Sequence, residues 1–378
     1  MPVTDHIRSK LSQVPHRPGV YIVSVLLHAG YLVRLERANA LPSIVIRDLA
    51  DGSEHVIAFD EQAYSLDLQR GFEFDTTTLR FAYSSMTTPA ETWDYDMASR
   101  QRTLRKRQQI PSGHDPARYV TTRLLARAAD GAEVPVSLLH RRGLVLDGTA
   151  PLLLYGYGSY GISIPAGFNT NILSLVDRGF IYAIAHVRGG QEKGRRWYKT
   201  GRLEHKTNTF DDFIAVAEDL MRRKITSPNH LGIQGGSNGG LLVSTVMVQR
   251  PELLGAVVCQ VPLIDMIAYT HIGAGASWVA EYGDPAIPAE RDYILTYSPY
   301  QNVKKGVKYP PVFFVTATSD DRVTPVHARK MAAKMEAQGH QVLFYENTDG
   351  GHAAAANHTE QAEMNALTFA YFRKMLVR

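Results

Sequence analysis

The chain has 378 residues, of which 44% are hydrophobic and 21% are charged, and its formal net charge is +4. These values are typical of a globular protein large enough for two domains, and the small net charge gives no reason to expect a nucleic-acid partner. The N-terminus lacks an apolar signal stretch, and the apolar run at 20–27 is too short to span a bilayer. We therefore expect a cytoplasmic protein with no membrane partner.

The first part of the chain predicts antiparallel β-structure. Short β-rich runs are separated by turns at 50–52 and 87–89, and the basic run 102–107 is expected to be an exposed strand. The other strands are predicted at 31–37, 43–49, 54–59, 79–85 and 91–97. This is material for about two four-stranded propeller blades, and a propeller cannot close with two. We expect residues 1–112 to form a partial β-propeller.

After a Pro- and Gly-containing linker at 110–116, strands and helices alternate. Strands are predicted at 119–126, 134–140, 151–157, 180–187, 230–234, 254–261, 311–317 and 342–346. Helices are predicted at 172–178, 210–222, 241–249, 326–338 and 359–375. Crossover helices after the third strand indicate a mostly parallel eight-stranded α/β sheet. Residues 113–378 are expected to form this second domain.

A Gly-rich turn between a predicted strand and a predicted helix carries the main chemical signal. It reads Gly235-Gly-Ser-Asn-Gly239, the pattern of a nucleophile elbow. Such a turn exposes the hydroxyl of Ser237 at the sheet edge, beside a helix N-terminus that favours developing negative charge. The sequence therefore indicates an α/β-hydrolase with Ser237 as the nucleophile.

A serine nucleophile needs a base and a group that orients the base, and α/β-hydrolases supply them in the order Ser, acid, His. An acidic pair follows the seventh strand, where Asp320 is favoured as the orienting acid over its neighbour Asp321. His352, flanked by glycines after the last strand, is expected to be the base. The competing histidines, expected to be structural, are His327, His340 and His358.

An oxyanion hole requires hydrogen-bond donors beside the nucleophile. The backbone N–H of Asn238 is one candidate, and a tyrosine of the loop 155–161 is another. This chemistry requires no cofactor, and no histidine or cysteine shows metal-ligand spacing. The single cysteine, Cys259, lies in an apolar run and is expected to be buried.

With these residues assembled, the chain resembles the prolyl oligopeptidase family of serine peptidases, including its oligopeptidase B branch. The resemblance runs from about residue 15 to the end and is carried by specific motifs. These are Tyr155-Gly-Tyr-Gly-Ser-Tyr-Gly, His186-Val-Arg-Gly-Gly, Asn208-Thr-Phe-Asp-Asp-Phe, Gly235-Gly-Ser-Asn-Gly-Gly and Ser319-Asp-Asp-Arg-Val-Thr-Pro. The likeness implies that Ser237, Asp320 and His352 form a catalytic triad. It also implies Tyr157 as a side-chain oxyanion donor beside the N–H of Asn238.

The resemblance further implies a peptide-binding pocket. Trp278 matches a tryptophan that stacks on a proline ring, Tyr282 lines the same region, and Arg322 matches an arginine that binds a substrate carbonyl. The oligopeptidase B branch instead uses glutamates near positions 278 and 280, where this chain has Trp278 and Ala280. Cleavage of short peptides after proline is therefore favoured. Cleavage after Arg or Lys, or esterase and acylaminoacyl hydrolase activity, remain alternatives.

The short N-terminal region departs from the family pattern of a seven-bladed propeller. A catalytically silent fragment or a binding module is therefore the alternative from a different class. Exposed blade edges also make self-association an expectation, because unpaired strands can pair with other chains.

Overall fold

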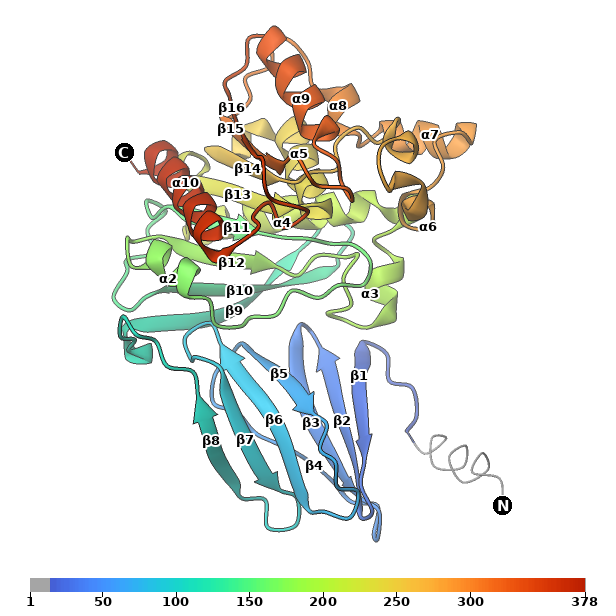
Figure 1. Ribbon diagram of the computed structural model, residues 1–378, viewed down its shortest axis with the longest axis vertical. Helices are drawn as coiled ribbons and strands as arrows, with labels where there is room; N and C mark the ends of the chain where they lie inside the picture. Colours follow the sequence, from blue (N-terminus) through green and yellow to red (C-terminus); the bar gives the residue numbers. More distant parts are fainter. Residues whose placement is uncertain (1–13, 378) are drawn as a thin grey trace.

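The computed structural model describes residues 14–377 and shows two four-stranded β-sheets beneath a domain built on an eight-stranded sheet (Figure 1). The N-terminal segment on which the localisation argument partly depends lies outside the described residues. Within residues 14–377, no helix is both long enough and apolar enough to cross a membrane.

Each of the two small sheets is an antiparallel meander, so the expectation of about two blades is confirmed. The first sheet comprises β1 (Val20–Leu27), β2 (Tyr31–Ala38), β3 (Leu41–Asp48) and β4 (Glu54–Val56). The second comprises β5 (Tyr64–Gln69), β6 (Thr78–Ser85), β7 (Glu91–Asp96) and β8 (Arg102–Arg107). Alternate residues of β6, such as Leu79 and Phe81, enter an apolar core shared by both sheets. All six residues of β8 are exposed, as the basic run predicts.

The large sheet is mostly parallel, which confirms the α/β prediction. Its order is β16-β15-β14-β13-β11-β12-β10-β9, and only the β9–β10 and β10–β12 pairs are antiparallel. The strands are β9 (Tyr119–Arg127), β10 (Glu133–Arg141), β11 (Leu152–Tyr155), β12 (Ile181–Ala185), β13 (Leu231–Gly236), β14 (Ala256–Gln260), β15 (Val312–Ala317) and β16 (Val342–Asn347). The buried parallel strands are almost uninterrupted apolar runs because helices cover both faces.

Helices α4 and α5 cover one face of this sheet, and α2 and α10 cover the other (Figure 1). The α-helices are α2 (Thr170–Val176), α3 (Arg195–Lys199), α4 (Thr207–Arg222), α5 (Asn238–Gln249), α6 (Val279–Tyr282), α7 (Pro288–Leu295), α8 (Pro299–Asn302), α9 (Val326–Ala337) and α10 (His358–Leu376). Short 3-10 helices lie at Pro116–Arg118, Leu203–His205, Pro228–His230, Pro251–Leu253, Tyr269–His271 and Gly275–Trp278. The close approach of α10 requires a glycine in β13, since a Cβ at Gly232 would lie 2.6 Å from the ring of Phe372.

Several element boundaries differ from the sequence prediction. The third strand of the large sheet stops at Tyr155 rather than 157, because Gly156 and Gly158 lead the chain into a close-packed loop. The predicted strand 54–59 is only β4, and β1 and β5 were not predicted as strands. The domain boundary at residues 112 and 113 falls between β8 and the 3-10 helix at Pro116–Arg118, and this division stays a prediction.

The second small sheet packs against the large domain through apolar side chains. Ala63 and Met86 share a buried cluster with Leu139 and Ile184 of the large sheet. The first small sheet contributes polar contacts, including a hydrogen bond from Arg37 Nη1 to Ser163 Oγ at 3.1 Å. The loop that follows β11 therefore lies between the large sheet and the blades.

Candidate active site

Ser237 occupies the sharp turn that joins β13 to α5. Its φ of 57° and ψ of −118° place a non-glycine residue in a strained region of the backbone map. The flanking glycines are sterically required, because a Cβ at Gly235 would lie 2.2 Å from the carbonyl oxygen of Gly239. The N–H of Ser237 donates to the carbonyl oxygen of Gln260 at 2.9 Å, which ties the turn to β14. This is the geometry of the predicted elbow.

Asp320 and His352 lie at the carboxyl ends of neighbouring strands and bind each other. Asp320 follows β15 and is 2% exposed, whereas His352 follows β16 and is partly exposed. His352 Nδ1 lies 2.8 Å from Asp320 Oδ2. The other oxygen of Asp320 accepts from the N–H groups of Arg322 and Val323, at 3.1 and 2.9 Å. Asp321 is exposed, so of the two adjacent aspartates only Asp320 is buried.

The competing histidines have other surroundings. The Nδ1 atom of His327 accepts from the N–H of Asp265 at 3.2 Å, and burial lowers the pKa of this imidazole to about 4. His340 lies against the carbonyl oxygen of Lys304, and His358 is the exposed first residue of α10. None of these arrangements includes a carboxylate hydrogen bond to the imidazole of the kind that His352 has.

The loop after β11 brings Tyr157 to the elbow. Asn238 Nδ2 donates to the carbonyl oxygen of Tyr157 at 2.5 Å. Burial raises the pKa of the Tyr157 hydroxyl to about 12, while hydrogen bonding with the Ser237 side chain and the charge of Arg322 counteract part of this effect. A hydroxyl with a raised pKa keeps its proton at neutral pH and can donate it in a hydrogen bond.

The three residues expected to form a peptide pocket differ in accessibility. Trp278 is partly exposed at the end of a 3-10 helix and packs against the main core. Arg322 is exposed next to Asp320. Tyr282 is 1% exposed, and its hydroxyl donates to Asn238 Oδ1 at 2.9 Å. Tyr282 thus contacts the elbow rather than solvent.

Glu281 stands between Ala280 and Tyr282, next to the residues expected to form the peptide pocket. In the structure it is 3% exposed, and its oxygens accept from Ser159 Oγ, the N–H of Tyr160 and Tyr198 Oη at 2.5, 3.0 and 2.8 Å. Sequence reasoning missed this set of contacts because its members are far apart along the chain. The sequence offered one signal for these contacts, namely Ser159, a polar residue in the otherwise aromatic and Gly-rich loop 155–161.

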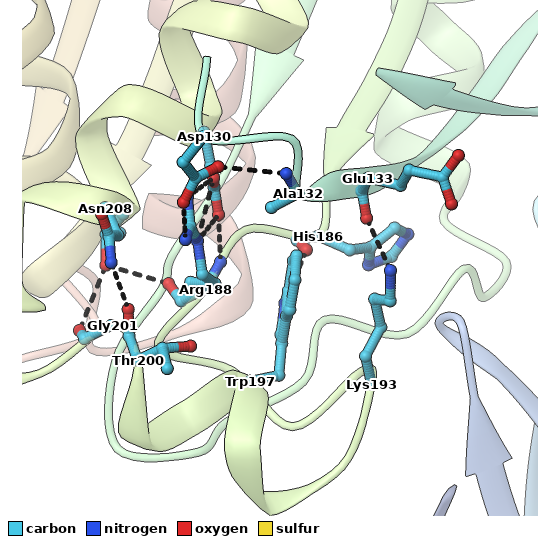
Figure 2. Close-up of polar contacts among 12 residues, drawn as sticks. Asp130, Ala132, Glu133, His186, Arg188, Lys193, Trp197, Thr200, Gly201 and Asn208 are labelled. Atoms are coloured by element: carbon cyan, nitrogen blue, oxygen red, sulfur yellow. Dashed lines mark hydrogen bonds and ion pairs between the residues drawn. The ribbon is translucent and has the colours of Figure 1, made fainter. Parts of the chain in front are cut away.

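The segment from Arg188 to Trp197 packs against the loop that carries Tyr157, since a Cβ at Gly158 would lie 3.1 Å from the carbonyl oxygen of Arg188. Arg188 binds Asp212 of α4 through Nε and Nη2, and it binds Asp130 through Nη1 at 2.5 Å. Trp197 Nε1 donates to the carbonyl oxygen of His186 at 3.1 Å (Figure 2). Burial raises the pKa of Asp212 to about 6, and Arg188 opposes this effect. This network fastens the end of β12 to α4.

Across residues 14–377, no group of three or more His, Cys, Asp or Glu side chains is arranged to hold a metal ion. Cys259 is fully buried, and its Sγ lies 3.0 Å from Ser244 Oγ.

A mostly parallel sheet with a serine at the turn between β13 and α5 defines an α/β-hydrolase. The chain belongs to the prolyl oligopeptidase family, whose model matches residues 166–377, and the family's N-terminal β-propeller model matches residues 2–108. The resemblance seen in the sequence is thereby confirmed.

Two curated relatives show the extent of the similarity. An uncharacterized peptidase of Sinorhizobium fredii is 47% identical over 275 residues, which cover 72% of this chain and 38% of the relative. The dipeptidyl aminopeptidase BI of Pseudoxanthomonas mexicana is 39% identical over 372 residues, which cover 96% of this chain and 51% of the relative. The chain thus spans about half the length of one relative and a smaller share of the other.

Solved structures of prolyl oligopeptidase family members are also similar to this chain. A structure from a study of two prolyl endopeptidases superimposes with a TM-score of 0.90 at 35% identity, covering 96% of this chain and 54% of that one. Oligopeptidase B from Leishmania major superimposes with a TM-score of 0.88 at 32% identity, covering 96% and 53%. Both branches named by the resemblance are therefore represented among the structural neighbours.

Proposed function

We propose that the chain is a serine peptidase that hydrolyses short peptides through an acyl-enzyme, with Ser237 as the nucleophile, His352 as the base and Asp320 as the orienting group. The observation that carries this proposal is the hydrogen bond between His352 Nδ1 and buried Asp320. A bond at Nδ1 holds the imidazole with Nε2 free to take the proton of a serine hydroxyl.

The acylation step assigns one role to each group. Ser237 Oγ attacks the peptide carbonyl carbon while His352 takes the hydroxyl proton. The carbonyl oxygen becomes an oxyanion that the N–H of Asn238 and the hydroxyl of Tyr157 stabilise. His352 then gives its proton to the leaving amine, and water releases the acyl group by the reverse sequence. The raised pKa of Tyr157 supports its role, because the hydroxyl must stay protonated to donate.

Post-proline cleavage is the favoured specificity. The partly exposed ring of Trp278 offers an apolar face for a proline ring, and Arg322 is exposed to bind a substrate carbonyl. The alternative of a basic P1 residue needs an acidic partner, and the side chain of Glu281 is buried with both of its oxygens already bonded. Among the described residues this geometry favours the proline pocket.

The similarity to a dipeptidyl aminopeptidase across 96% of this chain supports a second candidate, the release of N-terminal dipeptides. The two candidates differ in what they require of the substrate. A dipeptidyl aminopeptidase must accept a free α-amino group, whereas an endopeptidase cleaves substrates in which that group is blocked.

Fluorogenic peptides test both proposals. The substrates are fluorogenic Gly-Pro and Gly-Arg amides with a blocked N-terminus and a Gly-Pro amide with a free N-terminus. Cleavage of each is measured with the wild-type chain, with Ser237→Ala and with the exposed control Ser174→Ala. Cleavage of the blocked proline substrate that is lost only in Ser237→Ala supports the favoured function. Cleavage confined to the free substrate supports dipeptide release, and cleavage confined to the arginine substrate contradicts the proline pocket. A folded wild-type chain that cleaves nothing and is not labelled by a fluorophosphonate contradicts the peptidase proposal.

A further inference from the structure

The turn after Tyr157 is held between two buried charged side chains. Lys206, at the start of α4, is fully buried, and its Nζ donates to the carbonyl oxygen of Gly158 at 2.7 Å. Glu281, on α6, is 3% exposed, and its Oε1 accepts from the N–H of Tyr160 at 3.0 Å. A cation and an anion therefore bind backbone groups on the two sides of Ser159.

Ser159 joins the two charges. Lys206 Nζ donates to Ser159 Oγ at 3.2 Å, and Ser159 Oγ donates to Glu281 Oε1 at 2.5 Å. The directions are unambiguous, since an ammonium group can only donate and an ionised carboxylate can only accept. The second oxygen of Glu281 accepts from Tyr198, whose hydroxyl accepts from Arg202 Nη1 at 3.0 Å. The carboxylate is thus fully engaged inside the protein.

A second set of contacts runs from the same place to the elbow. Tyr160 Oη donates to Tyr282 Oη at 3.1 Å, and Tyr282 Oη donates to Asn238 Oδ1 at 2.9 Å. Asn238 Nδ2 in turn donates to the carbonyl oxygen of Tyr157. Lys206 Nζ also lies 5.4 Å from the centre of the Tyr282 ring, within cation–π range. The residues on both sides of the proposed oxyanion site are therefore linked through one network.

Two buried charged side chains are a large free-energy cost for a turn with only a structural role. Burying a charge costs several kcal/mol unless its partners are well placed. The backbone of the turn is also unusual, because Tyr160 is a non-glycine residue with a φ of 58°. Position 158 requires a glycine, since a Cβ there would lie 2.3 Å from Thr209 Cγ2. Strained loops with buried polar networks are characteristic of sites where donors must be held in advance of reaction.

We propose that Lys206, Ser159 and Glu281 are positioning residues that hold the Tyr157 hydroxyl beside the Asn238 N–H, where the oxyanion forms. This inference rests on the proposed function, in which those two groups stabilise the oxyanion. It assigns to Glu281 a role in holding the loop instead of a role as counter-charge for a basic substrate.

Steady-state kinetics with a blocked proline amide provide the first test. Lys206→Met and Glu281→Gln are expected to lower kcat by about 10- to 100-fold with KM within about threefold, because oxyanion donors act mainly in the transition state. The matched control is Glu204→Gln, an exposed carboxylate two residues from Lys206. Unchanged kcat in both network variants, or a change confined to KM, would overturn the proposal. Ser159→Ala keeps both charges and decides the matter if either variant fails to fold.

A double-mutant cycle separates positioning from general destabilisation. If Glu281 acts through Tyr157, the variant Tyr157→Phe/Glu281→Gln loses no more than about twofold beyond Tyr157→Phe alone. Losses that multiply across the two substitutions would mean that Glu281 acts independently of Tyr157, and the inference would fail.

Hydrogen exchange distinguishes failure of this inference from failure of the proposed function. In Lys206→Met and Glu281→Gln, amide exchange in the peptide 156–161 is expected to rise at least fivefold, with no change in Glu204→Gln. If the wild-type chain is inactive and unlabelled but these variants exchange faster, the network still holds the loop and only the peptidase proposal falls. Unchanged exchange in folded variants overturns the positioning role whatever the activity.

Discussion

His352 Nδ1 lies 2.8 Å from Oδ2 of Asp320, so two loops that follow neighbouring strands β15 and β16 meet in one buried hydrogen bond. Asp320 is 2% exposed and also accepts from two backbone N–H groups, which keeps its carboxylate in place. In Asp320→Asn the imidazole can adopt the wrong tautomer while the geometry stays intact. We expect kcat to fall by about 10³- to 10⁴-fold, measured with a blocked proline amide. Asp321→Asn is the matched control, and an equal loss in that variant would contradict the assignment.

Tyr157→Phe removes one proposed oxyanion donor without removing the ring. We expect kcat to fall by about 10²-fold or more, which corresponds to about 3 kcal/mol of transition-state stabilisation. KM should change little, because the donor acts on charge that develops during the reaction. Tyr155→Phe, at the end of β11 two residues before Tyr157, provides the comparison. Equal kcat in the wild type and Tyr157→Phe would remove Tyr157 from the proposed mechanism.

Gly235→Ala tests whether the elbow geometry is required. The added Cβ would lie 2.2 Å from the carbonyl oxygen of Gly239, so the strand and the helix must separate or the turn must change. We expect loss of Ser237 labelling by a fluorophosphonate, together with a lower melting temperature. The control Gly30→Ala adds a Cβ that meets nothing within 4 Å and should retain labelling. Normal labelling in Gly235→Ala would show that the turn tolerates the added atom.

Asp212→Asn tests the network of Figure 2. The carboxylate is completely buried and receives three hydrogen-bonding groups from Arg188, its backbone N–H included. Removing one partner leaves a buried guanidinium incompletely compensated, which costs about 3–5 kcal/mol of unfolding free energy. Urea denaturation measures the loss. The exposed neighbour Asp211 gives the control Asp211→Asn, which we expect to lie within about 0.5 kcal/mol of the wild type.

Because of Lys206, we expect the free energy of unfolding to vary with pH in the alkaline range. Burial lowers its pKa from 10.5 to about 8, and Glu281, which faces it from α6, opposes this effect. Tyr198 and Arg202 lie on the far side of Glu281. Between pH 8 and 10.5 the unfolded chain binds more protons at this lysine than the folded chain does. The contribution of Lys206 to stability therefore rises with pH in this window and is constant below it.

Urea denaturation at pH 7 and pH 9.5 measures this dependence. Relative to Lys206→Met, the wild-type chain should gain about 2 kcal/mol of unfolding free energy over that interval. The comparison with the variant cancels the titration of the tyrosines and of other lysines. A difference between the two proteins that does not change with pH would mean that Lys206 has an ordinary pKa.

The order of strands, helices and turns along the sequence, read from its hydrophobic periodicity, was sufficient to predict much of the fold. Apolar runs of strand length alternating with helical segments identified the parallel sheet, and two groups of turns identified two blades. Boundaries were less accurate where the chain leaves a strand by way of glycines, as at Gly156 after β11. β1 was missed because its apolar run was considered only as a membrane span.

The sequence by itself determined the fold class, the strand-to-helix turn that holds Ser237, and the candidates Asp320 and His352, because these are local patterns or follow a fixed order along the chain. Only the tertiary structure decided that Asp320 and not Asp321 meets His352, that Tyr282 is buried against Asn238, and that Glu281 and Lys206 enclose the Tyr157 loop. A buried lysine and glutamate have the same letters as exposed ones. Their role depends on which distant backbone groups they contact, and folding alone brings those groups together.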